Sequence, residues 1–373
     1  MSGQEELNLV RQCLDSKWVT QGPFVSEFEQ LFKTKHQCSH ALATTSCTAA
    51  LHLAALALNL GPGDEVIVPA FTWVTSAHCA EYVGAKVVFA DIDLATFNLN
   101  PQSVEAAITP QTKAIVAVHL FGLPAPMDEL KMLAIKYGLV IIEDGACAVG
   151  SLYKGAPVGT IGDIGCFSFH PRKVITTGEG GMLTTNNVRL AERLKSLRNH
   201  GTTGLPSGVD SSQAYAMSTF NMLGYNLRLS DIQAAVGVAQ MARLDGLLAG
   251  RRECAARYDS LLSDANDVVL PIAPDHYRHS YQSYVIRVKN GGRVRRNAIM
   301  DHLTSKGIQT RPGTHAVHRL GYYVKKYGII SEAFPRACEA EDSTITLPIF
   351  PGMSEVQSEQ VVSEVKTALG FVW

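Results

Sequence analysis

Residues 162–186 read GDIGCFSFHPRKVITTGEGGMLTTN and place one lysine, Lys173, between two strand-like runs and just before a glycine-rich turn. Lysine is rarely buried without a functional reason, and the apolar flanks predict a closed setting for this amine. Desolvation or nearby cations would favour a neutral amine, which is a nucleophile toward carbonyl carbons. We therefore expect Lys173 to form a covalent bond.

Alternating strands and helices extend from this segment over residues 40–240. Short runs of Val, Ile and Leu alternate with helical runs, which is typical of a mostly parallel sheet buried on both faces. The expected strands are 61–70, 86–93, 112–122 and 139–146, and the expected helices are 49–58, 75–85 and 127–138. We predict an α/β fold with a mostly parallel central sheet flanked by helices, and a ligand outside the carboxyl ends of its strands.

The sequence pattern changes after about residue 240. A long helix is expected over 241–264, then a strand at 281–288, a helix at 297–307, and strand-like fragments near 308 and at 343–348. We predict a large domain over residues 1–240 and a smaller α+β domain over residues 241–373.

Composition excludes several classes of function. The 33 basic and 34 acidic residues nearly cancel and form no block, so nothing indicates a nucleic-acid partner or a membrane surface. No apolar run reaches the roughly 18 residues of a membrane helix, and MSGQEELNLV lacks the pattern of a signal peptide. The eight cysteines form no C-x-x-C pair, which argues against a metal site and suits the reducing cytoplasm.

Three other segments could bind a flat ligand that carries a phosphate. Asp144 ends the run LVIIED and could hold a protonated ring nitrogen, or it could cap a helix. The turn through Cys47 and Thr48 enters a helix whose N–H groups suit a phosphate, or it is a plain N-cap. Trp73 follows a strand and could stack on a ring, or pack in the core.

Together these segments meet the requirements of pyridoxal 5'-phosphate (PLP). This cofactor needs a Schiff-base lysine, a carboxylate at the pyridine nitrogen and an anchor for its phosphate. Ser168, five residues before Lys173, could join that anchor. A dinucleotide-binding oxidoreductase is disfavoured, because no G-x-G-x-x-G follows a strand.

The chain resembles the sugar aminotransferases of the DegT/DnrJ/EryC1/StrS family, which have the PLP-dependent transferase fold of type I. The resemblance is carried by WVTQGPFVSEFE (18–29), GPGDEVIVPAFTWVTSA (61–77), FSFHPRKVITTGEGGM (167–182) and GYNLRLSDIQAAVG (224–237). One branch of this family performs dehydration and has histidine in place of the lysine. Lys173 therefore indicates a transaminase.

The resemblance implies a role for each matching position in the cofactor site. Lys173 matches the lysine that binds the cofactor, Asp144 the acid at the ring nitrogen, and Trp73 the stacking aromatic. The positions of Ser168 and of Cys47 with Thr48 match those that hold the phosphate.

Other matching positions concern the partner subunit and the sugar. Asn226 matches an asparagine that reaches the phosphate from the partner, which implies a homodimer with its active sites at the interface. His315 and His318 match two histidines of a segment near the sugar pocket. Arg228 and the residues around Arg311 are candidates to bind the diphosphate of a nucleotide.

Two cysteines depart from the family pattern. Cys47 replaces the usual glycine of the phosphate turn, so this turn has to accommodate a side chain. Cys147 stands where many members have Gln, His or Glu near the phenolic oxygen of the cofactor. Because a thiol is a weak hydrogen-bonding partner, we expect the electronic tuning of the cofactor to differ here.

The reaction implied by the resemblance is transfer of an amino group from L-glutamate to a nucleotide-linked keto-sugar. We expect a 4-keto-6-deoxy sugar, and an amino-sugar product for a surface polysaccharide such as lipopolysaccharide O-antigen, or for an antibiotic. The alternatives are amination at C3 of a 3-keto sugar nucleotide, a non-catalytic PLP-binding regulator, or another fold-type-I enzyme such as a cysteine desulfurase. The intact pair Lys173 and Asp144 argues against the regulator, while Cys147 leaves the desulfurase open.

Overall fold

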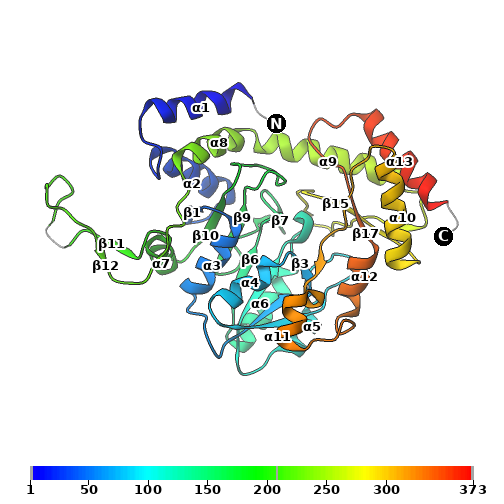
Figure 1. Cartoon of the computed structure of the whole chain (residues 1–373), viewed down its shortest axis with the longest axis horizontal. Coiled ribbons are helices and arrows are strands. Elements are labelled where there is room, and N and C mark those ends of the chain that lie inside the picture. Colours follow the sequence, from blue (N-terminus) through cyan, green and yellow to red (C-terminus); the bar gives the residue numbers. More distant parts are fainter. Residues whose placement is uncertain (1–2, 207–208, 371–373) are drawn as a thin grey trace.

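The computed structural model describes residues 3–206 and 209–370, and a seven-stranded sheet forms its centre (Figure 1). The strands, in spatial order, are β1 (His40–Thr44), β10 (Gly181–Thr185), β9 (Ile164–Ser168), β6 (Val140–Asp144), β5 (Thr112–Val118), β2 (Glu65–Pro69) and β4 (Lys86–Ala90). Neighbours from β9 to β4 pair in parallel, whereas β10 runs antiparallel to both β9 and β1. The predicted α/β fold with a mostly parallel sheet is confirmed.

Helices cover both faces of this sheet. Val66 and Val68 of β2 point into a core with α3, α4 and α7, while Ile67 points into a second core with α2, α6 and α8. A strand that is buried on both faces needs apolar residues at every position, which explains the continuous apolar runs in the sequence. The helices are α1 (Gln4–Asp15), α2 (Pro23–His36), α3 (Cys47–Ala57), α4 (Thr75–Tyr82), α5 (Pro101–Ala107), α6 (Met127–Tyr137), α7 (Val188–Arg198) and α8 (Asp231–Ala242).

A second, antiparallel sheet lies in the C-terminal part and has its own core. Its strands are β13 (Val268–Val269), β15 (Tyr284–Val288) and β17 (Thr344–Leu347). Helix α9 (Leu244–Leu261) leads from α8 toward this sheet, with α10 (Gly292–Ser305) and α13 (Glu355–Leu369) beside it (Figure 1). The helices α11 (Gly321–Tyr327) and α12 (Pro335–Ser343) complete this part. The domain boundary after residue 240 stays a prediction.

Three expected elements differ from the structure. The long helix begins at Leu244 rather than at 241, because α8 continues to Ala242 and the backbone changes at Arg243. No strand forms near residue 308 in the described chain, where Arg311 makes only an isolated bridge to Thr346. The strand expected over 112–122 stops at Val118 and is followed by a 3-10 turn in which Phe121 has a φ of 58°.

Short pairings connect distant segments. The strand β16 (His315–Ala316) pairs with β3 (Phe71–Thr72), and β14 (Tyr277–Arg278) pairs with β7 (Leu152–Tyr153), which also pairs with β8 (Ala156–Pro157). The hairpin of β11 (Thr202–Gly204) and β12 (Thr219–Phe220) projects from the body (Figure 1). None of the helices in the described part of the chain is long and apolar enough to span a membrane.

Candidate active site

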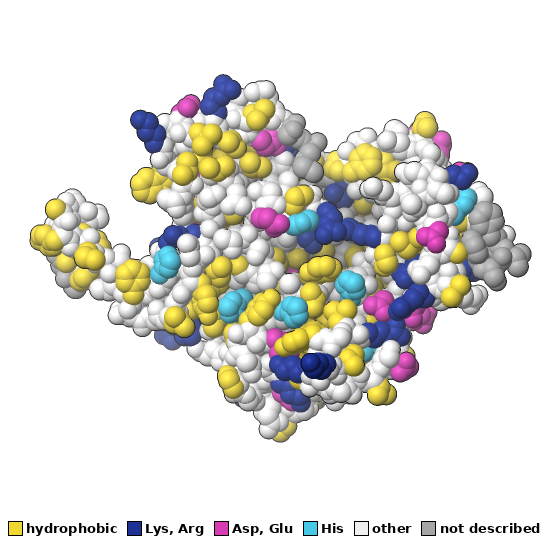
Figure 2. All heavy atoms as spheres, in the orientation of Figure 1, with side chains coloured by type: hydrophobic (Ala, Val, Ile, Leu, Met, Phe, Trp, Pro, Cys, Tyr) yellow, Lys and Arg dark blue, Asp and Glu magenta, His cyan; other side chains and the backbone are white. Residues whose placement is uncertain are grey.

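A cavity of about 740 Å³ lies at the carboxyl ends of β5, β6 and β9, where ligands of such sheets bind. Its wall includes most of the residues singled out in the sequence, namely Cys47, Thr48, Trp73, Asp144, Cys147, Ser168, Lys173, Arg311 and His315. Lys and Arg side chains gather near the centre of the face shown in Figure 2. Among residues 3–206 and 209–370, no group of three or more His, Cys, Asp or Glu side chains could hold a metal ion.

Lys173 lies in the loop that follows β9. A turn closed by the Lys173 N–H, which donates to His170 O at 2.8 Å, directs the side chain toward the cavity. Its Nζ donates to Cys147 Sγ at 3.2 Å, so the thiol that departs from the family pattern contacts the amine directly. The end of the loop returns through Gly178, whose φ of 81° favours glycine, into β10.

Asp144 is the last residue of β6 and is buried beneath the cavity. Its Oδ2 accepts a hydrogen bond from Ser76 Oγ at 2.6 Å, and its Oδ1 accepts from the Ala146 N–H at 3.1 Å. The two bonds fix the orientation of the carboxylate. The sequence analysis did not identify Ser76 as a site residue. Its position in the first turn of α4, three residues after Trp73, could have indicated it.

Buried hydrogen bonds support the strand that carries Asp144. Glu143 accepts hydrogen bonds from His119 Nε2 at 2.9 Å, from the Gly159 N–H at 2.7 Å and from the Gly162 N–H at 2.5 Å. Burial alone would raise the pKa of Glu143, but the hydrogen bonds from His119 and from the backbone N–H groups lower it below its usual value. The end of β6 is therefore held rigidly, with Asp144 next in sequence.

The N-terminus of α3 forms a cup for an anion. Ser46 caps the helix by accepting from the Ala49 N–H at 3.1 Å, while the N–H groups of Cys47 and Thr48 have no acceptor among the described residues. Strand β10 packs closely against this helix N-terminus: a Cβ on Gly181 would lie 2.5 Å from the carbonyl carbon of Ser46. Free N–H groups at a helix N-terminus bind phosphate well.

The turn accommodates the Cys47 side chain without backbone strain. Cys47 is the first residue of α3 and is absent from the residues with positive φ, so glycine is not required here. Burial, and then the charge of Asp144, raise the pKa of its thiol well above the usual range. The thiol therefore stays neutral and packs as a small apolar group.

Trp73 stands at the cavity edge rather than in the core. Its side chain is 54% exposed, and its ring lies 5.7 Å from that of His315. The pairing of β3 with β16 brings these two rings together, with His315 opposite Thr72. An exposed indole at this edge is free to stack on a bound ring.

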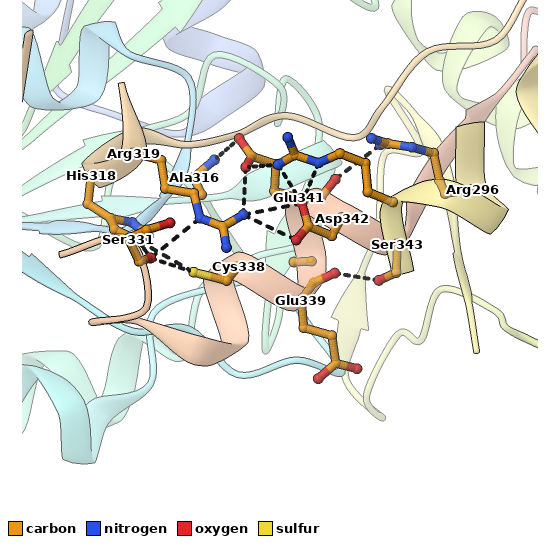
Figure 3. A network of polar contacts seen from close by, with 12 residues as sticks. Arg296, Ala316, His318, Arg319, Ser331, Cys338, Glu339, Glu341, Asp342 and Ser343 are labelled. Carbon is orange, nitrogen blue, oxygen red and sulfur yellow. Dashed lines mark hydrogen bonds and ion pairs between the residues drawn. The ribbon is translucent and has the colours of Figure 1, made fainter. Parts of the chain in front are cut away.

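His318 does not reach the cavity, contrary to the expectation that both histidines lie near the sugar. Its imidazole is fully buried, and its Nε2 donates to Ser331 O at 2.9 Å, as Figure 3 shows. Because the 3-10 turn Val317–Arg319 begins after His315, the side chains of His315 and His318 point in different directions. Its role in this structure is packing.

A network of charged groups holds the His315 segment in place (Figure 3). Glu341 accepts from the Ala316 N–H at 2.9 Å and from Arg319 Nη1 at 3.0 Å. Because β16 carries both His315 and Ala316, this carboxylate fixes the strand that faces the cavity.

Asn226 and Arg228 lie outside the cavity of their own chain. Asn226 is exposed and makes an isolated bridge to Asn199, whose side chain accepts a hydrogen bond from Arg228. Conversely, His170 and Arg172, to which sequence reasoning gave no role, both line the cavity.

The residues present fit PLP. The free N–H groups of Cys47 and Thr48, with Ser168 on the same wall, would hold its phosphate. Lys173 Nζ is in reach for the covalent bond, the fixed Asp144 would face the ring nitrogen, and Trp73 would cover a ring face.

Comparison with known proteins agrees with this geometry. The chain matches the DegT/DnrJ/EryC1/StrS aminotransferase family over residues 1–366. It is 38% identical to the spore coat polysaccharide biosynthesis protein SpsC of Bacillus subtilis, covering 98% of this chain and 94% of the relative. It is 37% identical to GDP-perosamine synthase of Caulobacter vibrioides, covering 98% and 95%.

Solved structures give the same result. The structure of S. venezuelae DesV in complex with a ketimine intermediate superposes with a TM-score of 0.89 at 34% identity, covering 99% of this chain and 95% of that one. A Streptococcus pneumoniae protein in its PLP form superposes with a TM-score of 0.91 at 30% identity, covering 99% and 97%. The chain belongs to the DegT/DnrJ/EryC1/StrS aminotransferase family and is a PLP-dependent sugar aminotransferase.

Proposed function

We propose that the enzyme transfers the amino group of L-glutamate to a nucleotide-linked 4-keto-6-deoxy sugar, giving an amino sugar for a surface polysaccharide. The observation that carries the proposal is one cavity wall that combines Lys173, the fixed carboxylate of Asp144 and the cup at α3. The relatives named for GDP-perosamine and for spore coat polysaccharide support the nucleotide sugar and the polysaccharide.

In the proposed reaction each of these residues has a separate role. PLP, when bound, supplies an electron sink for the carbon that loses its proton. Lys173 Nζ would accept that proton as a general base and then donate it as a general acid. Asp144, held by Ser76 and the Ala146 N–H, would keep a proton on the ring nitrogen. Trp73, which is exposed at the cavity edge, would cover one face of the bound ring.

Product analysis tests this function. Purified enzyme with L-glutamate is offered keto-sugar nucleotides that differ in nucleotide (UDP, GDP, dTDP) and in the position of the ketone. Mass spectrometry should find an amino-sugar nucleotide from a 4-keto-6-deoxy substrate, and NMR should place the new amine at C4. Amination of only 3-keto substrates would replace the proposal by its C3 alternative, and no amination of any sugar would refute it.

We further propose that the enzyme is a homodimer and that Asn226 completes the site of the partner subunit. Exposed apolar side chains cluster on the projecting hairpin and just after it, at Tyr215, Met217, Phe220 and Leu223. Apolar side chains exposed on a projecting arm are typical of a protein interface. Asn226, three residues beyond Leu223, is exposed and would be carried to the partner by the same contact.

Mixing two inactive variants tests this arrangement. If Asn226 acts across the interface, a mixed dimer of Lys173→Ala and Asn226→Ala has one site with both defects and one intact site. Co-expression should then restore about a quarter of wild-type activity, assayed at a PLP concentration that saturates only the wild type. Activity no greater than that of the separate variants would contradict a role in the partner's site. Sedimentation should show the dimer.

We place the enzyme in the cytoplasm. Its eight cysteines are all free, which suits a compartment where thiols stay reduced.

A further inference from the structure

Two buried hydroxyl groups lead from the wall of the cavity to the carboxylate of Asp144. Thr72 Oγ1 lies 3.0 Å from Ser76 Oγ, and Ser76 Oγ donates to Asp144 Oδ2 at 2.6 Å. Thr72 is the last residue of β3 and belongs to the cavity wall, while Ser76 lies in the first turn of α4. Both residues are fully buried. We call the hydroxyls of Thr72 and Ser76 the hydroxyl relay.

The hydrogen bonds of the hydroxyl relay run in one direction. A hydroxyl has one proton to donate and two lone pairs with which to accept. A charged carboxylate can only accept, so the single proton of Ser76 is used at Asp144. Ser76 Oγ must then accept from Thr72 Oγ1, although the distance alone would allow either donor. The relay therefore donates from Thr72 through Ser76 to Asp144.

This direction stabilises the negative charge of the carboxylate. Hydrogen bonds donated to a carboxylate favour its charged form. The bond from Thr72 polarises the Ser76 hydroxyl and strengthens it as a donor, and burial keeps water from competing for either bond. Within residues 3–206 and 209–370, Asp144 forms no ion pair with a Lys, Arg or His side chain. Its close partners are the relay and the Ala146 N–H, which donates to Oδ1 at 3.1 Å.

The proton at the ring nitrogen of a bound cofactor depends on this stabilisation. A proton shared between a pyridine nitrogen and a carboxylate stays on the nitrogen as long as the charged carboxylate is well stabilised. Where a donor to the carboxylate is lost, the proton is drawn toward the carboxylate oxygen. The ring then loses its positive charge and accepts electrons less readily.

The backbone on both sides of the relay is anchored. Thr314 Oγ1 donates to Thr72 O at 3.0 Å, and Thr72 lies opposite His315 in the pairing of β3 with β16. Cys79 Sγ donates to Ser76 O at 3.2 Å. Burial, and then the charge of Asp144, raise the pKa of the Cys79 thiol to about 12, so this thiol stays neutral. The two hydroxyls are therefore held in line without a further charge being placed beside them.

We propose that Thr72 and Ser76 are positioning residues for transamination. Acting through Asp144 and not on the substrates, they hold its carboxylate charged and oriented, and so keep the proton on the ring nitrogen of the bound cofactor. The inference rests on PLP-dependent transamination and does not depend on which sugar or which amino donor the enzyme uses.

The protonation of the ring nitrogen can be measured on the holoenzyme without any substrate. Enzyme loaded with PLP that carries nitrogen-15 in its ring gives an NMR signal whose position reports whether that nitrogen is protonated. The wild type should give the protonated position. Ser76→Ala should shift the signal toward the unprotonated position, Thr72→Val should shift it less, and Thr72→Ser, which keeps the hydroxyl, should restore it. A wild-type position in Ser76→Ala, or an unprotonated ring in the wild type, would overturn the proposal.

A double-mutant cycle shows whether the relay acts through Asp144. With saturating L-glutamate, the single-turnover loss of the visible cofactor absorbance should slow by about tenfold in Ser76→Ala and about threefold in Thr72→Val, with little change in the apparent Kd of L-glutamate. Added to Asp144→Asn, Ser76→Ala should slow the reaction by less than about twofold, because no charged carboxylate is left to stabilise. A full further loss in that background would overturn the proposal.

Ser358→Ala is the matched control, because Ser358 is another fully buried hydroxyl and lies on α13, away from the cavity wall. Its NMR signal and its rate should be those of the wild type. Melting temperatures show whether each variant folds, and Thr72→Val, which nearly keeps the shape of the side chain, decides if Ser76→Ala does not fold. If L-glutamate does not react, the proposed donor is wrong, and the NMR signals still decide on the relay.

Discussion

Replacing Lys173 by alanine should abolish amination, with kcat reduced by about 10⁴-fold or more. The change removes both the covalent attachment of the cofactor and the amine that moves the proton. No other lysine lines the described cavity wall, so no neighbour can take over. Steady-state kinetics measure the rate, and the visible absorbance of the purified protein reports the loss of the covalent bond.

A second readout separates the loss of the bond from misfolding. Borohydride reduction followed by peptide mass spectrometry should find the cofactor on the Lys173 peptide of the wild type and on no peptide of the variant. Lys113→Ala, which changes an exposed lysine in β5, is the matched control and should behave as wild type. Amination by Lys173→Ala at the wild-type rate would refute the assignment.

Changing Asp144 to asparagine should lower kcat by about 10²- to 10³-fold, with a smaller effect on the KM of the substrates. A neutral amide cannot keep a proton on the ring nitrogen as a carboxylate does, so the electron sink weakens. Because the amide has nearly the same shape and can still accept from Ser76 Oγ, the variant should fold. Single-turnover kinetics of the donor half-reaction measure the effect directly.

The control for this variant is Asp128→Asn, which changes an exposed aspartate at the start of α6. It should leave both half-reactions unchanged. A kcat for Asp144→Asn within about tenfold of wild type would mean that the ring nitrogen does not depend on this carboxylate.

The fold and the cofactor wall were predictable because their signals are local. Strands buried on both faces are rich in apolar residues; Asp144 is the last residue of one such strand, and Lys173 lies in the loop after another. The residues next to Trp73 in the sequence did not show whether its side chain lies in the core or at the cavity edge. The pairing of β3 with β16 places it at the edge.

The rest of the site depends on contacts or directions that sequence spacing does not encode. Ser76 meets Asp144 from 68 residues away. His318 is three residues from His315, yet the 3-10 turn between them buries one ring and leaves the other at the cavity. Only the structure shows that, on the same cavity wall, Arg293 pairs with Asp342 while the guanidinium of Arg311 has no partner among the described residues.

The contact between β3 and β16 has a consequence for the order in which the enzyme forms during synthesis. Thr314 Oγ1 donates to Thr72 O at 3.0 Å across 242 residues of chain. A nascent chain that has emerged only to residue 240 would contain Lys173, Asp144 and the cup at α3, but neither His315 nor Arg311. Since domains fold from the N-terminus as they leave the ribosome, the parts that hold the cofactor can form first. The wall that faces the substrates closes last, when the final third of the chain is released.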